Sequence, residues 1–396
     1  MTTAVSEKSN AAAQNILCGR DIVCFSHDWT GDPLSKTHLM RVLSRENRIL
    51  WVNAIANRTP TTSSKDVSRI FKKLKNFAEP VREVEPNIFV LSPLAIPAYG
   101  SFAVRNFNEK FLALQVKKAM RKLSFKRPVN MIFNPAAGLL AGKIGEESLI
   151  YYCVDDYTAF TGAAKGLKEI EEDLFKKAAL VIVSAEKLLE NKKHFNKNTF
   201  IIRHGVDFNH FCKALDEETK IPDEIRDLPK PVIGFHGLLA DWIDYDLIVK
   251  IAAHFKDGSI VLIGKTTVDA ERVIGKVQNL PNVHLLGRKP YADLPAFCKG
   301  FDVALNPFAI NDLTLAANPL KVREYLAAGL EVVSTAIPEV EIMNICRIGR
   351  THNEFIAEIE NALKNPRPKQ EISEAIRAES WESRIDELRE IMGRAK

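Results

Sequence analysis

The sequence lacks several features that would place it in other protein classes. No apolar run approaches the roughly 20 residues of a membrane-spanning helix, and the N-terminal MTTAVSEKSNAAAQ lacks the hydrophobic stretch of a signal peptide. The six cysteines (18, 24, 153, 212, 298 and 346) form neither a CxxC pair nor a metal-ligand spacing. A zinc site and a disulfide framework are therefore not expected. We expect reduced thiols in a cytoplasmic protein.

The length and the hydrophobic pattern predict two α/β domains. A chain of 396 residues is too long for one hydrophobic core, and two domains of about 200 residues are expected. Short apolar runs alternate with helical patterns along most of the sequence, which favours parallel sheets. No G-x-G-x-x-G follows the first expected strand, Asp21 to Ser26, so the dinucleotide-binding fingerprint is absent.

The net charge of +5 is unevenly distributed. Residues 60–127 contain 14 Lys and Arg against 5 Asp and Glu, a local charge of +9 that leaves −4 for the remainder. Apolar and basic residues alternate at helical spacing around 65–77, and a second expected helix, about 103–124, ends in basic residues. An anionic membrane surface and nucleic acid are both possible partners. No nucleic-acid motif is present, so we favour the membrane, with a solvated charged face as the structural alternative.

The stretch from Asn318 to Gly329 has both ends of a helix marked. Asn318 is a favourable N-cap, Pro319 suits the first helical position, and Gly329 is a left-handed terminator. Lys321 stands in the first turn, where the dipole favours an acid, and helix N-termini bind anions. One turn later, Glu324 can accept hydrogen bonds from ribose hydroxyls. The pattern is typical of a diphosphate site and also of an amphipathic helix whose lysine faces solvent.

Polar residues follow the first expected strand. His27, Asp28 and Trp29 stand between that strand and a helix expected at about 34–46. Open α/β sheets bind ligands at the carboxyl ends of their strands. The three residues are therefore candidates for substrate contact, and a loop with a helix-capping pair is the structural alternative.

Two adjacent acids, Asp155 and Asp156, follow the expected strand Leu149 to Val154. Mutual repulsion raises one of the two pKa values, which suits a general base. The structural alternative is a carboxylate that caps a helix beginning near Ala163.

Several of these segments resemble glycosyltransferases with two Rossmann-like domains, the GT-B type. NPLKVREYLAAGLEVVST, from Asn318, is similar to their donor-nucleotide helix, written roughly P-x-K-x-x-E-Y-x-A-x-G-x-P-V-V. HGVDFNHF, from His204, resembles their N-G-V-D-x-x-x-F segment, and we expect Gly205 to allow a sharp turn that Asp207 caps. SHDW and YCVDD resemble bacterial exopolysaccharide enzymes, including xanthan-type glucuronosyltransferases. Ala316 stands where the retaining enzymes have a second glutamate, and Glu331 replaces a proline.

The resemblance implies roles for the site residues. Lys321 would contact the nucleotide diphosphate and Glu324 the ribose. The other donor-binding residues would be Asn318, Leu320, Gly237, Arg288 and Phe308. Asp156 falls on the position of the catalytic base, with Asp155 one residue away, and His27, Asp28 and Trp29 would line the cleft or bind the acceptor. Lys321 and the amides from Asn318 to Leu320 would hold the diphosphate, so no metal is expected, and the acidic pair is not a D-x-D metal motif. No cofactor is expected either, since the nucleotide-sugar is a substrate.

The expected fold is α/β, with two Rossmann-like domains facing a cleft. We expect a flexible tail at 1–19 and an acceptor-binding domain at 20–204 that carries the basic insert 60–127. A nucleotide-sugar domain would cover 205–380, with a linker at 213–230. The helix at 381–396 would cross back to the first domain.

The predicted function is transfer of a hexosyl or uronosyl group from a nucleotide-sugar, UDP favoured, to a lipid-linked or membrane-associated saccharide in bacterial exopolysaccharide biosynthesis. We expect inversion with an Asp base and a cytoplasmic protein bound peripherally to the inner membrane, without nucleic acid. A retaining transferase or a nucleotide-sugar epimerase of the same fold are the alternatives. A non-enzymatic membrane- or RNA-binding protein fits least well, because it does not need a capped helix with an inward lysine.

Overall fold

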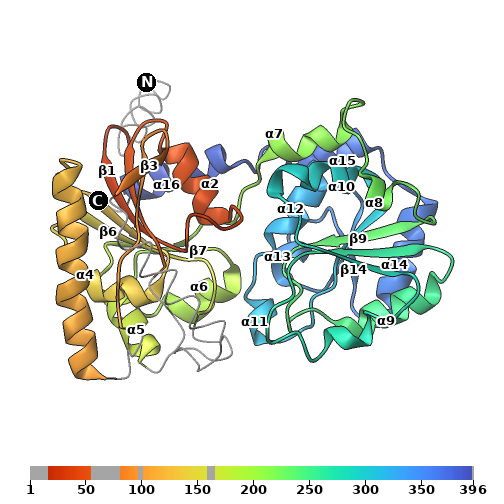
Figure 1. Ribbon diagram of the computed structural model, residues 1–396, viewed down its shortest axis with the longest axis horizontal. Helices are drawn as coiled ribbons and strands as arrows, with labels where there is room; N and C mark the ends of the chain where they lie inside the picture. The colour runs from red at the N-terminus through yellow and green to blue at the C-terminus, as the bar shows by residue number, and fades with distance from the viewer. Residues whose placement is uncertain (1–16, 55–80, 97–100, 158–165, 395–396) are drawn as a thin grey trace, which may run out of the picture. The chain divides into compact units, whose positions relative to one another are not determined.

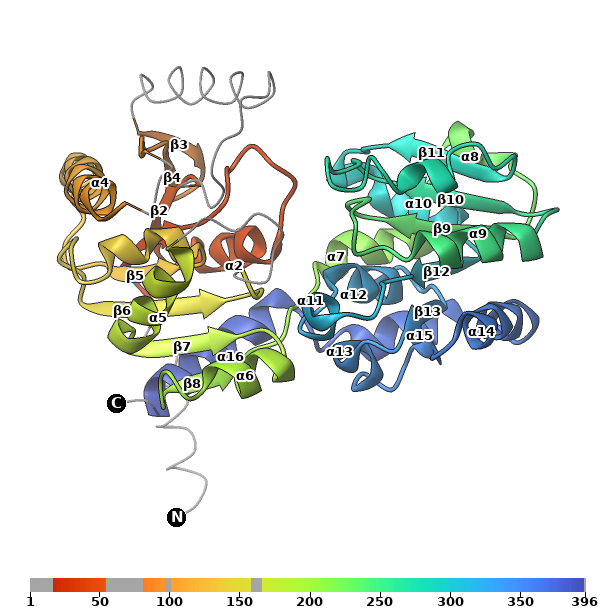
Figure 2. The same cartoon turned by 90° about the horizontal axis from the view of Figure 1, so that it is seen from below.

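The computed structural model describes residues 17–54, 81–96, 101–157 and 166–394. The chain forms two compact units, Met1–Arg203 with Arg384–Lys396, and His204–Ser383. Each unit is built on one sheet covered by helices (Figures 1 and 2), so the predicted α/β class with two Rossmann-like bodies is confirmed. The predicted basic helix around 65–77 lies outside the described residues.

The described residues of the first unit form an eight-stranded sheet in the order β3-β4-β2-β1-β5-β6-β7-β8. Neighbouring strands are parallel except in the β3–β4 hairpin. The bounds are β1 (Asp21–Phe25), β2 (Arg48–Val52), β3 (Arg82–Glu85), β4 (Ile88–Leu91), β5 (Val129–Ile132), β6 (Ser148–Cys153), β7 (Leu180–Val183) and β8 (Thr199–Ile201). The strand order reverses between β1 and β5, so the carboxyl ends of these two strands mark the switch point where such sheets bind ligands.

The helices of the first unit cover both faces of its sheet. Figure 1 shows α2 and α16 on one face and α5 and α6 on the other. The bounds are α2 (Ser35–Leu43), α4 (Phe102–Lys122), the 3-10 helix η1 (Pro135–Leu140), α5 (Leu167–Lys177), α6 (Glu186–Lys192) and α16 (Trp381–Arg394). Helix α16 follows the second unit in the sequence, yet Ile385 and Leu388 are each 1% exposed. From Arg384 onward the chain belongs to the first unit.

The sheet of the second unit is parallel throughout, in the order β11-β10-β9-β12-β13-β14. The bounds are β9 (Val232–His236), β10 (Ser259–Ile263), β11 (Val283–Gly287), β12 (Val303–Asn306), β13 (Val332–Thr335) and β14 (Arg347–Gly349). These strands read as continuous apolar runs because both faces of a parallel sheet are buried. The switch point lies between β9 and β12.

The helices of the second unit also cover both faces. Figure 1 shows α10 and α15 on one face of the sheet and α9 and α14 on the other. The bounds are α7 (Phe208–Phe211), η2 (Cys212–Leu215), α8 (Asp223–Arg226), α9 (Tyr245–His254), η3 (Ile274–Lys276), η4 (Tyr291–Asp293), α10 (Leu294–Gly300), α11 (Asp312–Leu315), α12 (Leu320–Ala327), α13 (Pro338–Glu341), α14 (His352–Lys364) and α15 (Lys369–Ile376).

Two predictions about the start of the second unit are wrong. The stretch 213–230 is not a linker, because it contains α8 and buries Ile225 at 1% exposure. A Cβ on Gly300 of α10 would lie 2.5 Å from the Ile225 Cδ1, so the two segments are closely packed. Gly205 is required by close packing rather than by a sharp turn, since a Cβ there would lie 2.9 Å from the backbone of Ser380. The predicted cap at Asp207 is confirmed by its acceptance of a hydrogen bond from the His210 amide.

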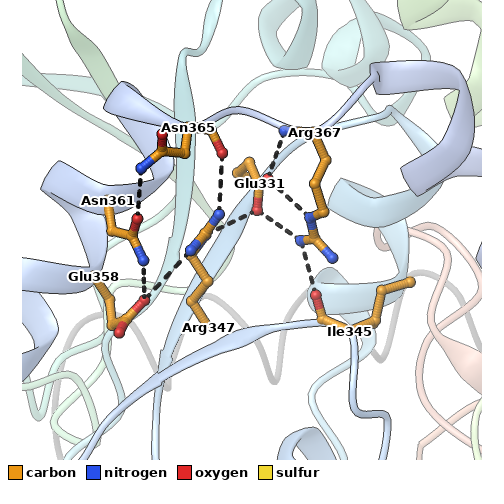
Figure 3. A network of polar contacts seen from close by, with 7 residues as sticks. All are labelled: Glu331, Ile345, Arg347, Glu358, Asn361, Asn365 and Arg367. Carbon is orange, nitrogen blue, oxygen red and sulfur yellow. Dashed lines mark hydrogen bonds and ion pairs between the residues drawn. The ribbon is translucent and has the colours of Figure 1, made fainter.

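Glu331, at the position where similar sequences have proline, ties three segments together (Figure 3). Its carboxylate is 3% exposed in the side chain and accepts from Arg347 Nε at 3.1 Å and from Arg367 Nη2 at 2.6 Å. Arg367 also donates to the Ile345 carbonyl at 2.9 Å, and Arg347 to the Asn365 carbonyl at 3.2 Å. Burial alone would raise the pKa of Glu331, but the hydrogen bonds from the two arginines lower it to about 2. Through these hydrogen bonds Glu331, next to β13, connects that strand to β14 and to the segment before α15.

Candidate functional site

Helix α12 begins one residue later than predicted, and the proposed N-cap is wrong. Pro319 is the N-cap and makes no side-chain capping bond. Asn318 is buried, and its Oδ1 accepts a hydrogen bond from Arg323 Nη1 at 2.6 Å. The amides of Leu320 and Lys321 therefore open the helix.

The C-terminus of α12 is as predicted. Gly329 has a φ of 74°, its amide bonds to the Leu326 carbonyl, and the Leu330 amide bonds to the Tyr325 carbonyl. These two bonds form a Schellman motif, which satisfies the last carbonyls of the helix.

Lys321 points into the switch point of the second sheet and not into open solvent. Its Nζ lies 4.6 Å from the ring centroid of Phe308, after β12, and 5.3 Å from that of Phe235, on β9. Its Cε lies 2.6 Å from the place a Cβ would take on Gly237, whose φ is 140°. Glycine at 237 therefore leaves room for the lysine stem, and two aromatic faces stabilise the ammonium.

Glu324 lies one turn beyond Lys321 and is 7% exposed. Within the described part of the chain its carboxyl accepts no hydrogen bond, and its nearest ionisable partner is the His236 Nε2 at 3.8 Å. That ring nitrogen is itself buried without a hydrogen-bond partner among the described residues. A buried acid whose oxygens have no internal donor is suited to accept hydrogen bonds from a ligand.

Burial shifts the pKa values of Lys321, Glu324 and His236 in the directions that favour their uncharged forms. Burial raises the pKa of Glu324 to about 8, against the opposing effect of Lys321. Burial lowers the pKa of Lys321 to about 8, with Glu324 opposing. Burial and the charge of Lys321 lower the pKa of His236 to about 3, so the imidazole is neutral at pH 7. A bound anion would therefore favour the charged form of Lys321.

The ends of three strands meet beside Lys321. The Gly237 amide bonds to the Ile263 carbonyl, and the Gly264 amide to the Gly287 carbonyl. Arg288 is exposed directly after β11, two strands away from β9. The structure thus brings Gly237, Phe308, Lys321 and Glu324 into one cluster and leaves Arg288 at the rim of the same sheet edge.

The two acids after β6 have different surroundings. The Asp156 Oδ1 accepts from Lys192 Nζ at 3.3 Å, and the same ammonium lies 3.3 Å from Glu171 Oε2. Glu171 is 1% exposed and also accepts from the Tyr151 hydroxyl at 2.5 Å. Asp156 is therefore part of a buried ionic network.

Asp155 has no such partner. Its carboxylate accepts no hydrogen bond among the described residues, and burial raises its pKa, while Lys36 lowers it and Asp156 raises it. Lys36, the second residue of α2, is 8% exposed, and its Nζ donates to the Tyr157 hydroxyl at 3.0 Å. The proposed helix cap near Ala163 lies outside the described residues.

His27 has partners within the protein at both ring nitrogens. Its Nδ1 lies 3.1 Å from the Ser26 hydroxyl and its Nε2 lies 3.3 Å from the Thr37 hydroxyl. Burial and the charge of Lys36 lower the pKa of the His27 ring from its usual value to about 3. These contacts favour the structural alternative for His27.

Asp28 and Trp29 are held against the end of β2. The Asp28 Oδ1 accepts from the Ala54 amide at 3.2 Å, and the Trp29 amide donates to Asn53 Oδ1 at 2.9 Å. The Trp29 ring meets Trp51 edge to face, with centroids 4.9 Å apart. A contact of this loop with substrate stays a prediction.

Sequence reasoning did not identify Lys36, Tyr157, Lys192 or His236. The sequence could have indicated Lys36, because it stands in the first turn of its helix, where a lysine is unusual, as Lys321 does in α12. Among the described residues, no group of three or more His, Cys, Asp and Glu is arranged to hold a metal ion. In the same part of the chain, no helix combines the length and the apolar character that crossing a membrane requires.

Comparisons with known proteins agree with this architecture. Residues 230–365 match the family model of the group 1 glycosyl transferases. Over 224 residues the chain is 24% identical to the teichuronic acid biosynthesis glycosyltransferase TuaH, as that Bacillus subtilis (strain 168) protein is named, covering 53% of this chain and 55% of that protein. The chain thus spans about half the length of this curated relative.

Solved structures with a similar fold cover nearly the whole chain. Sucrose-phosphate synthase from Thermosynechococcus elongatus has a TM-score of 0.66 at 15% identity and covers 93% of this chain and 97% of its own. HepE of Anabaena, in complex with UDP, has a TM-score of 0.60 at 11% identity and covers 95% of this chain and 100% of its own. The fold is that of GT-B glycosyltransferases, and the segment that matches the group 1 model lies within the second unit.

Proposed function

We propose that this chain, whose residues 230–365 form a group 1 glycosyltransferase domain, transfers a sugar from a nucleotide-sugar donor to a saccharide acceptor. The observation that carries the proposal is the position of Lys321 at the switch point of the second sheet, one turn before the buried Glu324. Parallel α/β sheets bind their ligands at this place. The cluster has the groups that a nucleoside diphosphate needs, a cation for phosphate and an acceptor for ribose hydroxyls.

The donor is a UDP-sugar in this proposal. Lys321 and the first amides of α12 bind the diphosphate and offset the negative charge that develops on the leaving group. The same cation makes a metal ion unnecessary, and the nucleotide-sugar is a substrate and not a cofactor. HepE, which has the same fold, has been solved with UDP, which supports the choice of nucleotide.

The transfer inverts the anomeric centre. One of the acids after β6 takes the proton of the acceptor hydroxyl as its oxygen attacks the anomeric carbon. The bond from that carbon to the diphosphate oxygen breaks, and its electron pair leaves with the diphosphate. Ala316 is 3% exposed and stands where retaining enzymes have a second glutamate, which supports inversion.

The acceptor is a lipid-linked or membrane-associated saccharide of bacterial exopolysaccharide or cell-wall biosynthesis. The name of the curated relative, with its reference to teichuronic acid, supports a polysaccharide pathway and a uronosyl or hexosyl group. Helix α4 has six basic residues against one acid. Its exposed apolar side chains are Phe102, Phe107 and Leu114, at 76%, 51% and 59% exposure. A basic helix with exposed apolar side chains suits peripheral binding to the inner leaflet of the cytoplasmic membrane.

The proposal is tested by thermal unfolding of wild type and Lys321→Ala with UDP, GDP, dTDP and ADP. A nucleotide at about 100 times its Kd should stabilise the protein by roughly 2.7 kcal/mol. We expect stabilisation by UDP that is lost in Lys321→Ala and kept in Lys250→Ala, an exposed lysine on α9. Absence of any shift with all four nucleotides would contradict the proposal.

The stereochemistry of the product separates the remaining alternatives. Proton NMR of the product formed from a UDP-sugar and an acceptor distinguishes inversion from retention at the anomeric carbon. An epimerase of the same fold would convert the donor without any acceptor. We expect inverted product that forms only when an acceptor is present.

A further inference from the structure

We propose that Asp155 is the general base and that Lys36 is its positioning residue, which holds the loop after β6 through the Tyr157 hydroxyl and places a positive charge beside that loop. The inference rests on the proposed function, because it assigns the proton acceptor of that transfer. The sequence pattern placed Asp156 at the base position, and the contacts of the two acids favour its neighbour.

Asp156 is already engaged by an internal cation. Its carboxylate is 18% exposed and pairs with Lys192, whose side chain is 9% exposed. Lys192 in turn pairs with Glu171, so one cation serves two acids. To bind an acceptor hydroxyl through the same oxygen, Asp156 would have to give up its pair with Lys192.

Asp155 has the opposite environment. No hydrogen bond reaches its carboxylate from the described residues, so both oxygens remain available to an acceptor hydroxyl. Its backbone is nevertheless fixed, because its carbonyl accepts from the Tyr157 amide at 3.1 Å and from the Cys153 thiol at 3.4 Å. A base needs this combination of a fixed backbone and an unoccupied carboxylate.

Lys36 reaches this loop from a distant part of the chain. It stands 121 residues before Tyr157, and its ammonium donates to the Tyr157 hydroxyl and lies 5.7 Å from the ring centroid. The described residues provide no carboxylate in contact with this ammonium. A buried cation with a hydroxyl as its direct partner is costly, and the neighbouring charge of Asp155 is the interaction that offsets the cost.

Among the titratable groups around Asp155 and Lys36, the charge that favours the ionised form of Asp155 is that of Lys36. On its own loop Asp155 faces Asp156 and Tyr157, and Lys36 comes from α2. Lys36 also faces the thiols of Cys24 on β1 and Cys153 on β6. Burial raises the pKa of both thiols, and the pKa of His27 is lowered, so these groups are neutral at pH 7. Without Lys36, burial and Asp156 would both favour protonation of Asp155.

The test is a 13C NMR titration of the full chain labelled at the aspartate carboxyl carbons. The Asp155 resonance is the one missing from Asp155→Asn. In Lys36→Met we expect its titration midpoint to rise by about one pH unit or more, as expected for the loss of a nearby opposite charge. Lys192→Met is the matched control, because it removes a buried cation that pairs with Asp156 and Glu171, and it should leave the Asp155 midpoint unchanged.

Two further measurements complete the test. Lys36→Arg restores a positive charge and should return the Asp155 midpoint toward the wild-type value, which separates loss of charge from loss of packing. Slow hydrolysis of UDP-glucose, in which water replaces the acceptor, gives a pH profile of the rate. In Lys36→Met the apparent pKa of the acid limb of this profile should rise by the same amount as the Asp155 midpoint. Asp155→Asn should lose this activity at every pH.

The outcomes separate this inference from the proposed function. An unchanged Asp155 midpoint in Lys36→Met, or full activity of Asp155→Asn with loss in Asp156→Asn, would overturn the inference. Failure of UDP to stabilise the wild type would instead contradict the donor site in the second unit, whatever the titration shows. Thermal unfolding of each variant establishes that it is folded before it is titrated.

Discussion

At the scale of single residues, each unit has a lysine at the second position of a helix, Lys36 buried and Lys321 half-buried. Lys36 in α2 and Lys321 in α12 both stand where the helix dipole favours an acid. Each lies near the carboxyl edge of a parallel sheet, and burial lowers the pKa of both. A cation kept in an unfavourable place needs a compensating charge, which we assign to a bound diphosphate for Lys321 and to Asp155 for Lys36.

The pKa of Lys321 makes nucleotide binding depend on pH. Its ammonium loses the proton near pH 8 in the free protein, and a bound diphosphate would hold the proton to higher pH. Glu324 becomes charged in the same range and then repels the phosphate. Affinity for UDP should therefore fall above pH 8, by up to about tenfold per pH unit for each coupled proton. Isothermal titration between pH 7 and pH 9.5 measures this.

The matched comparison for that titration is Lys321→Met. Its affinity for UDP should be low at pH 7 and should depend less on pH than that of the wild type. A wild-type affinity that stays constant from pH 7 to pH 9.5 would contradict the role of Lys321 as a phosphate ligand.

At the scale of elements, the second sheet is held in part by Glu331, a charged residue at a position where similar sequences have proline. Glu331 directly precedes β13 and is bound by Arg347 from β14 and by Arg367 from the segment before α15. The element order of βα units does not require this acid. Its network replaces the local stiffness that a proline would give with contacts to distant parts of the chain.

The stability contribution of Glu331 has a defined dependence on pH. Its pKa falls from about 4.5 in the unfolded chain to about 2, which corresponds to on the order of 3 kcal/mol. The contribution is fully present above pH 4.5 and decreases as the pH falls toward 2, by about 1.4 kcal/mol per unit. Glu331→Gln should lose most of it at pH 7. Urea unfolding at pH 7 and pH 3.5 measures the difference.

Glu374→Gln on α15 is the control for that experiment. Glu374 is exposed and pairs with Arg377 within one helix turn, so its removal should change stability little at either pH. If Glu331→Gln were as stable as Glu374→Gln at pH 7, the network around Glu331 would not hold these strands.

Helix α4 has the charge to bind an anionic surface. Lys117 and Lys118 are adjacent and exposed near its C-terminus. Each basic residue near an anionic bilayer contributes about 1 kcal/mol, so Lys117→Glu with Lys118→Glu should weaken binding to phosphatidylglycerol vesicles by about 30-fold or more. Co-sedimentation with vesicles at fixed salt concentration measures the binding.

The control pair for vesicle binding lies on another helix of the same unit. Lys187→Glu with Lys193→Glu, an exposed residue of α6 and the exposed residue at its C-terminal cap, makes the same change of charge on a helix other than α4. Equal loss of binding in both double variants would indicate an effect of net charge and contradict a specific membrane-binding role of α4.

At the scale of the whole molecule, the chain leaves the first unit, builds the second and returns. Helix α16 contributes Ile385, Leu388 and Ile391 to the interior of the first unit. Arg389 of the same helix pairs with Glu46 and reaches the Leu17 carbonyl. The first unit therefore requires the C-terminal end of the sequence for its stability.

Leu388→Ala tests this dependence. Removal of a fully buried leucine should destabilise the first unit by about 2–5 kcal/mol. The stabilisation by UDP should remain, because the proposed nucleotide site lies in the second unit. Limited proteolysis should show earlier cleavage within residues 17–203, and Glu390→Ala, exposed on the same helix, should behave as wild type. Equal protection of both variants would contradict the prediction.

Sequence reasoning found most elements and missed the hairpin of β3 and β4. Its strands flank Pro86 and Asn87, and Asn87 has a φ of 62°, a conformation that asparagine tolerates. These two short strands lie within the region 60–127, which was interpreted from its basic and apolar residues as helical. Besides β3, β4 pairs with β2, a strand distant in the sequence, and such a partner is not visible in a local pattern.

The βα order, the left-handed end of α12 and the pair of Lys321 and Glu324 can be predicted from the amino-acid sequence, because they follow from spacing within a few residues. Which of the two acids after β6 is paired depends on the folded chain, since Lys192 reaches Asp156 across 36 positions. The tertiary structure likewise decided the place of Lys36, whose partner is 121 positions away, and the role of Asn318, which serves Arg323 instead of capping α12. Periodicity and capping are local, whereas the charge that a buried group faces depends on which distant segments fold beside it.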